Sequence, residues 1–224
     1  MEEKRQAINL PVIDDPKSII SEQFKTLRTN ILFTASDEKM KKILVTSTVP
    51  GEGKTTISSN LALSFAVSNY KTLLIDCDLR KSKIHKIFEL MNNTGLSNVI
   101  AGQTTYENAI RKNIYKNFDI LTAGPTPPNP TEILSSQTME KLLERLEEDY
   151  EIIIIDAPPL LAVADSQILS NSVDGAVLVV NSLAKNRNEI IKAKNILDKG
   201  KCKICGAVLN KMNKNVENEY YYGN

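Results

Sequence analysis

Short, almost wholly apolar runs alternate with longer amphipathic segments along the chain, and this alternation predicts the order of its strands and helices. The apolar runs predict strands at residues 42–47, 71–76, 118–123, 175–181 and 205–210, and in EIIIIDAPP, which starts at Glu151. Strands without polar alternation are typical of a parallel sheet that is covered on both faces. The pattern therefore predicts an α/β domain with a mostly parallel sheet flanked by helices.

The amphipathic segments predict where the helices lie. A stripe of four apolar residues indicates a helix over about residues 16–35, with Pro16 in its first turn; the stripe consists of Ile20, Phe24, Leu27 and Ile31. A second helix is expected from Lys54 to about Ser68.

A further helix is expected to begin after Asn129. Asn129 can cap it, Pro130 suits its first position and Glu132 holds the capping-box position. An apolar stripe at helical spacing continues the pattern, with Met139, Leu142, Leu143 and Leu146 as its members.

The segment TVPGEGKTT follows the first predicted strand and opens a helix, which is the context of a phosphate-binding loop. Gly53, Lys54 and Thr55 match the Walker A pattern, although Thr48 stands where the strict pattern has glycine. Backbone N–H groups of such a loop surround phosphate oxygens, the lysine reaches the β- and γ-phosphates, and the hydroxyl can bind Mg²⁺. The expected nucleotide contacts are Pro50, Gly51, Glu52, Gly53, Lys54, Thr55 and Thr56.

Acidic residues end two of the apolar strands. Asp156 closes EIIIID, where an unpaired carboxylate would be costly, so it is expected to hold Mg²⁺ as a Walker B residue. Asp76 and Asp78 close LLIDCD and exceed the needs of one ion, so one can accept a proton from an incoming hydroxyl. Arg80 and Lys81 are expected to steady phosphate charge, and the alternative is a polar turn with solvated charges. Asn210, at the end of the last strand, either touches adenine or forms a turn.

The composition is that of a globular domain and gives no sign of a secreted or membrane-spanning protein. The 224 residues are 42% apolar and 25% charged, as in an ordinary globular domain, and the net charge of +1 gives no reason to expect a nucleic-acid partner. The polar N-terminus lacks a signal peptide, and no apolar run approaches the ~18 residues of a membrane span. A cytoplasmic protein is expected. Cys202 and Cys205 form C-x-x-C, which a structural role in a strand explains better than metal or redox use.

Three motifs together resemble the bacterial tyrosine kinases (BY-kinases) of capsule and exopolysaccharide operons. VPGEGKTT, LLIDCDLRK and IIIIDAPP are similar to the Walker A, A′ and B motifs of that family, and AGPTPPNPTEIL resembles its proline-rich segment. The resemblance implies a P-loop NTPase-type fold over residues 1–210 and binding of ATP and Mg²⁺. It implies that Lys54 and Thr55 bind ATP–Mg²⁺, that Asp78 and Asp156 hold the metal, and that Asp76 is the base.

The same resemblance implies partners. SEQFKTLRTNI is similar to the family's N-terminal oligomerisation helix, which places Glu22, Lys25 and Arg28 in the interface of a ring-like homo-oligomer. Lys25 stands where the family has arginine and so lacks the bidentate fork. A membrane activator is expected to complete the site with its cytoplasmic tail and to hold the kinase at the inner face of the membrane. Tyrosine-containing protein substrates and a phosphotyrosine phosphatase are the remaining expected partners.

Three adjacent tyrosines near the C-terminus, Tyr220, Tyr221 and Tyr222, resemble the family's tyrosine cluster. Their polar neighbours favour a flexible tail over residues 211–224, and the resemblance makes the three tyrosines phosphate acceptors. The alternative is an aromatic terminus that docks on its own surface. Seven basic residues against two acidic ones over residues 185–203 indicate either a solvated helix face or a surface for anionic lipid.

The predicted function is autophosphorylation on tyrosine by a kinase that regulates polysaccharide synthesis. One alternative is an ATPase switch of the partitioning or septum-site type, which would not need the acceptor tail. Another is a non-catalytic nucleotide-dependent scaffold, which would not need both Asp76 and Asp78.

Overall fold

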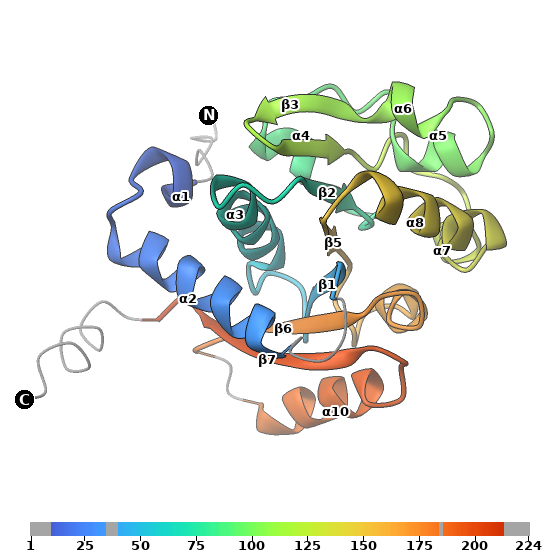
Figure 1. The fold of residues 1–224 in the computed structure, drawn as a ribbon. Helices are drawn as coiled ribbons and strands as arrows, with labels where there is room; N and C mark the ends of the chain where they lie inside the picture. Colours follow the sequence, from blue (N-terminus) through green and yellow to red (C-terminus); the bar gives the residue numbers. More distant parts are fainter. Residues whose placement is uncertain (1–9, 35–39, 184–185, 213–224) are drawn as a thin grey trace, which may run out of the picture.

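The core of the protein is a seven-stranded sheet with the strand order β3-β4-β2-β5-β1-β6-β7. The computed structural model describes residues 10–34, 40–183 and 186–212 (Figure 1). All neighbouring strands are parallel except β3 and β4, which confirms the predicted mostly parallel α/β fold. The strands are β1 (Lys42–Ser47), β2 (Thr72–Asp76), β3 (Arg111–Tyr115), β4 (Phe118–Leu121), β5 (Ile152–Asp156), β6 (Gly175–Asn181) and β7 (Lys203–Asn210).

Helices cover both faces of the sheet. In β5, Ile152 and Ile154 join the apolar core on the side of α1, α2 and α3, whereas Ile153 and Ile155 join the core under α8 and α10 (Figure 1). Burial on both faces is the reason that β5 is apolar throughout. The helices are α1 (Pro11–Asp14), α2 (Ile19–Thr34), α3 (Lys54–Val67), α4 (Ile84–Ile87), α5 (Leu96–Ile100), α6 (Tyr106–Ala109), α7 (Pro130–Leu134), α8 (Gln137–Asp149), α9 (Asp165–Leu169) and α10 (Arg187–Leu197).

The N-terminal helical region differs from its prediction. The helix begins at Ile19 rather than near Pro16, and a separate short helix, α1, precedes it. Phe24 and Ile31 are buried as expected, but Ile20 is 43% exposed. The buried position of that turn belongs to Ser21, whose hydroxyl donates to the Pro11 carbonyl oxygen at 2.8 Å. Packing of α1 against α2, which periodicity does not report, therefore decides which residue faces inward.

The helix predicted after Asn129 is in fact two helices, α7 and α8. The chain breaks between them, and the Ser136 hydroxyl caps α8 by accepting from the Met139 N–H. Asn129 does not cap α7 through its side chain; its amide donates to the Glu132 carboxylate at 3.0 Å instead. The predicted apolar stripe is buried along α8, because all four of its members lie beyond the break.

Strand ends shift by one or two residues from their predicted positions. β2 begins at Thr72, β4 ends at Leu121 and β7 begins at Lys203. β3 was not predicted, because its partly exposed residues lack an apolar run; it is the antiparallel edge strand of the sheet.

The carboxyl ends of the central strands bring the motifs together. β5 lies between β1 and β2, so the loop after Ser47 is next to the ends of the two acidic strands. Asp76 and Asp156 are direct neighbours in the register of β2 and β5. Among the described residues, no helix has both the length and the apolar character to span a bilayer.

Candidate active site

The phosphate-binding loop joins β1 to α3. Gly51 and Gly53 have φ values of +86° and +95°, which residues with a side chain rarely adopt. A Cβ atom on Gly53 would also lie 2.2 Å from the Asn210 amide nitrogen. Helix α3 begins at Lys54, directly after the loop, so its N-terminal N–H groups and dipole face the loop. The backbone thus has the form that an anionic phosphate group requires.

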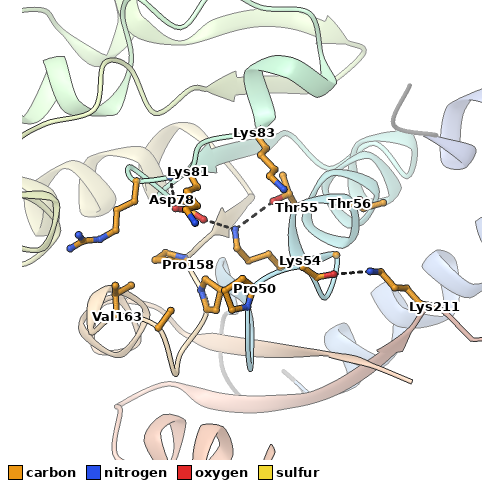
Figure 2. Close-up of a pocket in the computed structure, with 15 residues that line it drawn as sticks. Pro50, Lys54, Thr55, Thr56, Asp78, Lys81, Lys83, Pro158, Val163 and Lys211 are labelled. Atoms are coloured by element: carbon orange, nitrogen blue, oxygen red, sulfur yellow. Dashed lines mark hydrogen bonds and ion pairs between the residues drawn. The ribbon is translucent and has the colours of Figure 1, made fainter. Parts of the chain in front are cut away.

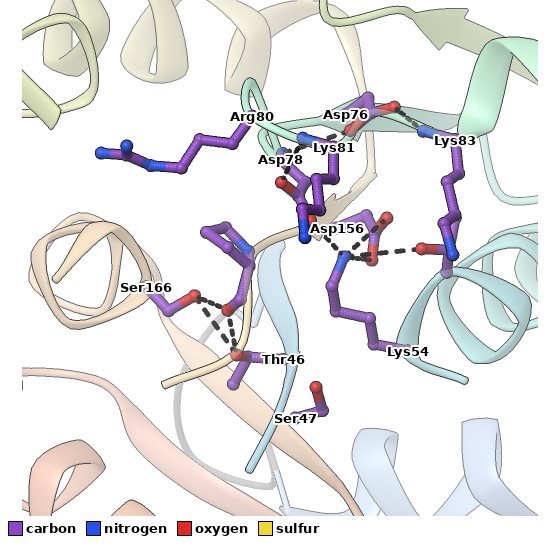
Figure 3. Close-up of polar contacts among 12 residues, drawn as sticks. Thr46, Ser47, Lys54, Asp76, Asp78, Arg80, Lys81, Lys83, Asp156 and Ser166 are labelled. Carbon is purple, nitrogen blue, oxygen red and sulfur yellow. Dashed lines mark hydrogen bonds and ion pairs between the residues drawn. The ribbon is translucent and has the colours of Figure 1, made fainter. Parts of the chain in front are cut away.

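Lys54 lies among the carboxylates at the strand ends (Figure 3). Its Nζ atom is 3.0 Å from Asp78 Oδ2 and 3.5 Å from Asp156 Oδ1. Burial alone would lower the pKa of Lys54, but the charges of Asp156 and Asp78 outweigh it and raise that pKa. Asp76 brings a third carboxylate to the same edge, where it is the register neighbour of Asp156.

Asp76 lies below the cavity and is fully buried. Its carboxylate accepts from the backbone N–H groups of Lys83 and Ile84, both at 3.1 Å, and of Asp78 at 3.2 Å. Burial, followed by the charge of Asp156, raises the pKa of Asp76 to about 7. Burial therefore makes this carboxyl group harder to ionise than an exposed aspartate.

A cavity of about 520 Å³ opens above these residues (Figure 2). It brings together most residues of the predicted nucleotide site with others that the sequence analysis did not select. The predicted members of the lining are Pro50, Gly51, Gly53, Lys54, Thr55, Thr56, Asp78 and Arg80. Lys81, which the sequence analysis named with Arg80, lines it too, and the further members are Lys83, Pro158, Pro159, Ala162, Val163 and Lys211. The only sequence signal for the apolar wall is the Pro-Pro pair just after Asp156.

Among the predicted contacts from Pro50 to Thr56, only Glu52 does not line this cavity, and its side chain is buried. Its carboxylate accepts from the backbone N–H groups of Thr48 at 2.7 Å, Val49 at 3.0 Å and Asn181 at 3.0 Å. The side chain therefore ties the phosphate-binding loop to the end of β6.

Replacing Glu52 by glutamine is expected to destabilise the protein. The amide must turn an NH₂ group toward at least one backbone N–H, which costs about 1–3 kcal/mol in the free energy of unfolding. The melting temperature measured without nucleotide should fall by roughly 2–10 °C. Glu144→Gln, at an exposed position on α8, is the control and should leave it unchanged. Equal melting temperatures for the two variants would contradict the role of Glu52.

Arg80 turns away from the three carboxylates although it lines the cavity (Figure 3). Its Nε donates to Asp165 Oδ2 at 3.0 Å, and its Nη2 donates to the Thr131 hydroxyl at 2.8 Å. Thr131 in turn donates to Asp165 at 2.7 Å. In this conformation Arg80 connects the loop after β2 to α7 and α9.

Asn210 and Lys211 place the end of β7 against the phosphate-binding loop. The Asn210 amide donates to the Glu52 carbonyl oxygen at 2.8 Å, and Lys211 Nζ donates to the Gly51 carbonyl oxygen at 2.8 Å (Figure 2). Asn210 is thus more than a turn residue.

The residues of the expected oligomer interface lie on α2. Glu22 and Lys25 form an ion pair with a distance of 2.7 Å, and both side chains are largely exposed. Arg28 instead donates to Ser64 on α3, at 2.6 Å to its carbonyl oxygen and 3.0 Å to its hydroxyl. Tyr220, Tyr221 and Tyr222 lie outside the described residues.

Relatives of known function match almost the whole chain. A family model described as an AAA domain matches residues 40–186. Tyrosine-protein kinase YwqD of Bacillus subtilis is 44% identical over 98% of this chain and 93% of that protein. Tyrosine-protein kinase CpsD of Streptococcus agalactiae is 36% identical over 91% of this chain and 88% of that protein. Tyrosine-protein kinase etk of Escherichia coli is 33% identical over 99% of this chain, which corresponds to 31% of its own length.

Solved structures of similar proteins have the same fold as this chain. The chimerical protein CapA2B2 superposes with a TM-score of 0.89 at 42% identity and covers 92% of this chain and 90% of its own. The kinase domain of Escherichia coli tyrosine kinase ETK gives 0.88 at 33% identity, with coverages of 95% and 84%. The septum-site-determining protein MinD of Pyrococcus horikoshii gives 0.65 at 26% identity, with coverages of 76% and 70%. The chain therefore belongs to the bacterial tyrosine kinase (BY-kinase) family and is a protein-tyrosine kinase with a P-loop NTPase-type fold.

Proposed function

We propose that this kinase uses ATP and Mg²⁺ to phosphorylate its own C-terminal tyrosines, and that it thereby regulates capsule or exopolysaccharide synthesis. The nucleotide part of this proposal is carried by Lys54 and Asp78, which line the cavity and pair with each other, and by the buried Asp156, which pairs with the same lysine. Support also comes from MinD, whose solved structure holds Mg-ADP on the same fold.

Each polar group of the floor has a proposed task. The N–H groups of Gly51 and Gly53 and the ammonium group of Lys54 bind the phosphates, with Pro50 and Thr56 beside them. Thr55, Asp78 and Asp156 hold Mg²⁺, which neutralises charge on the β- and γ-phosphates when bound. Glu52 serves through its backbone, because its carboxylate is occupied by the loop itself.

The proposed transfer moves the γ-phosphoryl group from ATP to a tyrosine oxygen and releases ADP. A phenol with a pKa near ~10 must lose its proton in this step. Asp76 is the proposed acceptor of that proton, because it ends β2 opposite Asp156 at the edge of the site and burial raises its pKa. Most of the remaining rate acceleration comes from holding ATP and the phenol in position relative to each other.

The acceptors are proposed to reach the cavity from the end of β7. Lys211 contacts the phosphate-binding loop, and Tyr220 follows nine residues later. An extended chain spans ~3.3–3.6 Å per residue, so the tail can reach roughly 30 Å. That distance suffices for the chain's own site or for that of a neighbour in a ring.

The partners are proposals as well. The similar structure CapA2B2 is a chimerical protein, and we propose that a segment of a second protein completes this kinase. We place Glu22 and Lys25 in the interface of a ring-like oligomer, with Arg28 contributing only if it leaves Ser64. A membrane activator would hold this ring at the inner face of the membrane, and a phosphotyrosine phosphatase would reverse the modification.

Phosphotyrosine on the purified full chain, incubated with Mg-ATP with and without a candidate activator tail, tests the proposal. The matched comparison is a chain with phenylalanine at Tyr220, Tyr221 and Tyr222, which should lose the signal while keeping ATP binding. A signal that persists in this variant would place the acceptors elsewhere in the chain. ATP hydrolysis without phosphotyrosine under any condition would favour the ATPase switch.

A further inference from the structure

Five cationic side chains line the cavity, and three of them are already held by groups of the protein. Lys54 pairs with two carboxylates, Arg80 pairs with an acid on α9, and Lys211 donates to a carbonyl oxygen of the phosphate-binding loop. Lys81 and Lys83 are different: neither forms an ion pair with any of the described residues. The positive charge on this rim of the cavity is therefore available to a bound molecule.

The rim that carries these two lysines is held by the acidic residues of the site. The Lys81 N–H donates to Asp78 Oδ1 at 2.9 Å, and the Lys83 N–H donates to Asp76 Oδ2 at 3.1 Å. Both residues are exposed, and both side chains extend from the loop after β2 toward the Lys54 side of the cavity (Figures 2 and 3). These bonds hold the backbone from which the two side chains extend.

The rim and the phosphate-binding loop line the same cavity but follow different strands of the sheet. β5 lies between β2, which leads to the rim, and β1, which leads to the phosphate-binding loop. The stretch after β5 adds apolar lining from Pro158, Pro159 and Val163, against which an aromatic ring can pack. A phenol that enters between this wall and the rim places its neighbouring residues beside Lys81 and Lys83.

We propose that Lys81 and Lys83 select acceptor tyrosines that have an anionic group beside them, either a carboxylate or a tyrosine already phosphorylated. This inference rests on the proposed function, since it concerns the acceptor of the same reaction. The chain's own tail fits it, because Glu219 precedes Tyr220 and the next two residues are also tyrosines. Each phosphate adds about −1.5 to −2 charges at pH 7, so the first phosphorylation strengthens binding for the next.

Peptide kinetics with the full-length protein test the proposal. Three peptides carry one acceptor tyrosine each, preceded by glutamate, glutamine or phosphotyrosine, and kcat/KM is measured under the conditions that give phosphotyrosine on the chain itself. The wild-type protein should prefer the glutamate peptide to the glutamine peptide by about 3- to 10-fold at low salt, and the phosphotyrosine peptide still more. The preference should weaken at high salt, because the charges are exposed.

The double variant Lys81→Met/Lys83→Met should bring this ratio close to one. Lys86→Met is the control, because Lys86 is exposed on α4 outside the cavity, and it should keep the wild-type ratio. Equal use of the glutamate and glutamine peptides by the wild-type protein, or an unchanged ratio in the double variant, would overturn the inference. A raised KM for ATP without a changed ratio would also overturn it and assign the lysines to the nucleotide. Absence of phosphotyrosine on every peptide and on the chain would instead overturn the proposed function.

Discussion

Lys54→Met is expected to lower the rate of phosphotyrosine formation by at least about 10²–10³-fold, the usual cost of removing a group that stabilises transition-state charge. Lys54 is the cation at the floor of the cavity, with Asp78 and Asp156 as its partners, and methionine keeps its length without its charge. Initial rates with saturating Mg-ATP measure the effect. Lys112→Met, at an exposed position on β3, is the control and should keep the wild-type rate.

The melting temperature of Lys54→Met should also show that the lysine neutralises the carboxylates beside it. Without the ammonium group, Asp78 and the fully buried Asp156 lose their nearest counter-charge, so the melting temperature without metal should fall. Mg²⁺ should then raise the melting temperature of the variant more than that of the wild-type protein. A variant that keeps its rate, or that responds to Mg²⁺ no more than the wild-type protein does, would contradict the placement of Lys54 between phosphate and metal ligands.

Asp76→Asn is expected to lower kcat by about 10²–10⁴-fold, the usual contribution of a positioned general base. An amide cannot take the phenol proton, whereas the carboxyl group of Asp76, with its pKa raised to about 7, can. The KM for ATP should change little, because Asp76 lies below the cavity lining. The melting temperature is measured as well, since asparagine also disturbs the three hydrogen bonds that the carboxylate accepts from backbone N–H groups.

Asp78→Asn is the comparison that separates the two acidic roles. Asp78 lines the cavity and pairs with Lys54, so its loss should raise the Mg²⁺ concentration needed for half-maximal rate. A large fall in kcat for Asp78→Asn with an unchanged Mg²⁺ requirement, together with near-normal turnover by Asp76→Asn, would move the role of base from Asp76 to Asp78.

Local patterns were sufficient for much of the fold and for the floor of the site. The runs of isoleucine, leucine and valine predicted the central strands, because residues that face two packed helical layers must all be apolar. The glycines of the phosphate-binding loop indicated a backbone with positive φ. Asp76 and Asp156 lie at the same edge of the sheet because β2 and β5 are parallel, so their carboxyl ends meet there.

Contacts between distant parts of the chain were not predictable in this way. Arg80 and its partner Asp165 are 85 positions apart, so the sequence did not predict this pair. Arg80 also lines the cavity, and its contact with phosphate stays a prediction. Glu52 was expected to contact nucleotide, but its carboxylate meets the N–H group of Asn181, 129 positions away. Ile20 matched the helical period, yet the packing of α1 gave the buried position to Ser21.

The sequence by itself determined the chemistry that the site contains: a loop for phosphate, a lysine, and acids at strand ends that require a cation or a proton. These follow from backbone geometry and burial over a few neighbouring residues, which a short pattern records. Only the tertiary structure decided which side chains face the cavity and which are held by remote partners. It also decided that Lys81 and Lys83 line the cavity without an ion pair to another described residue. A side chain's direction depends on the elements that pack around it, and the chain brings those together only when it folds.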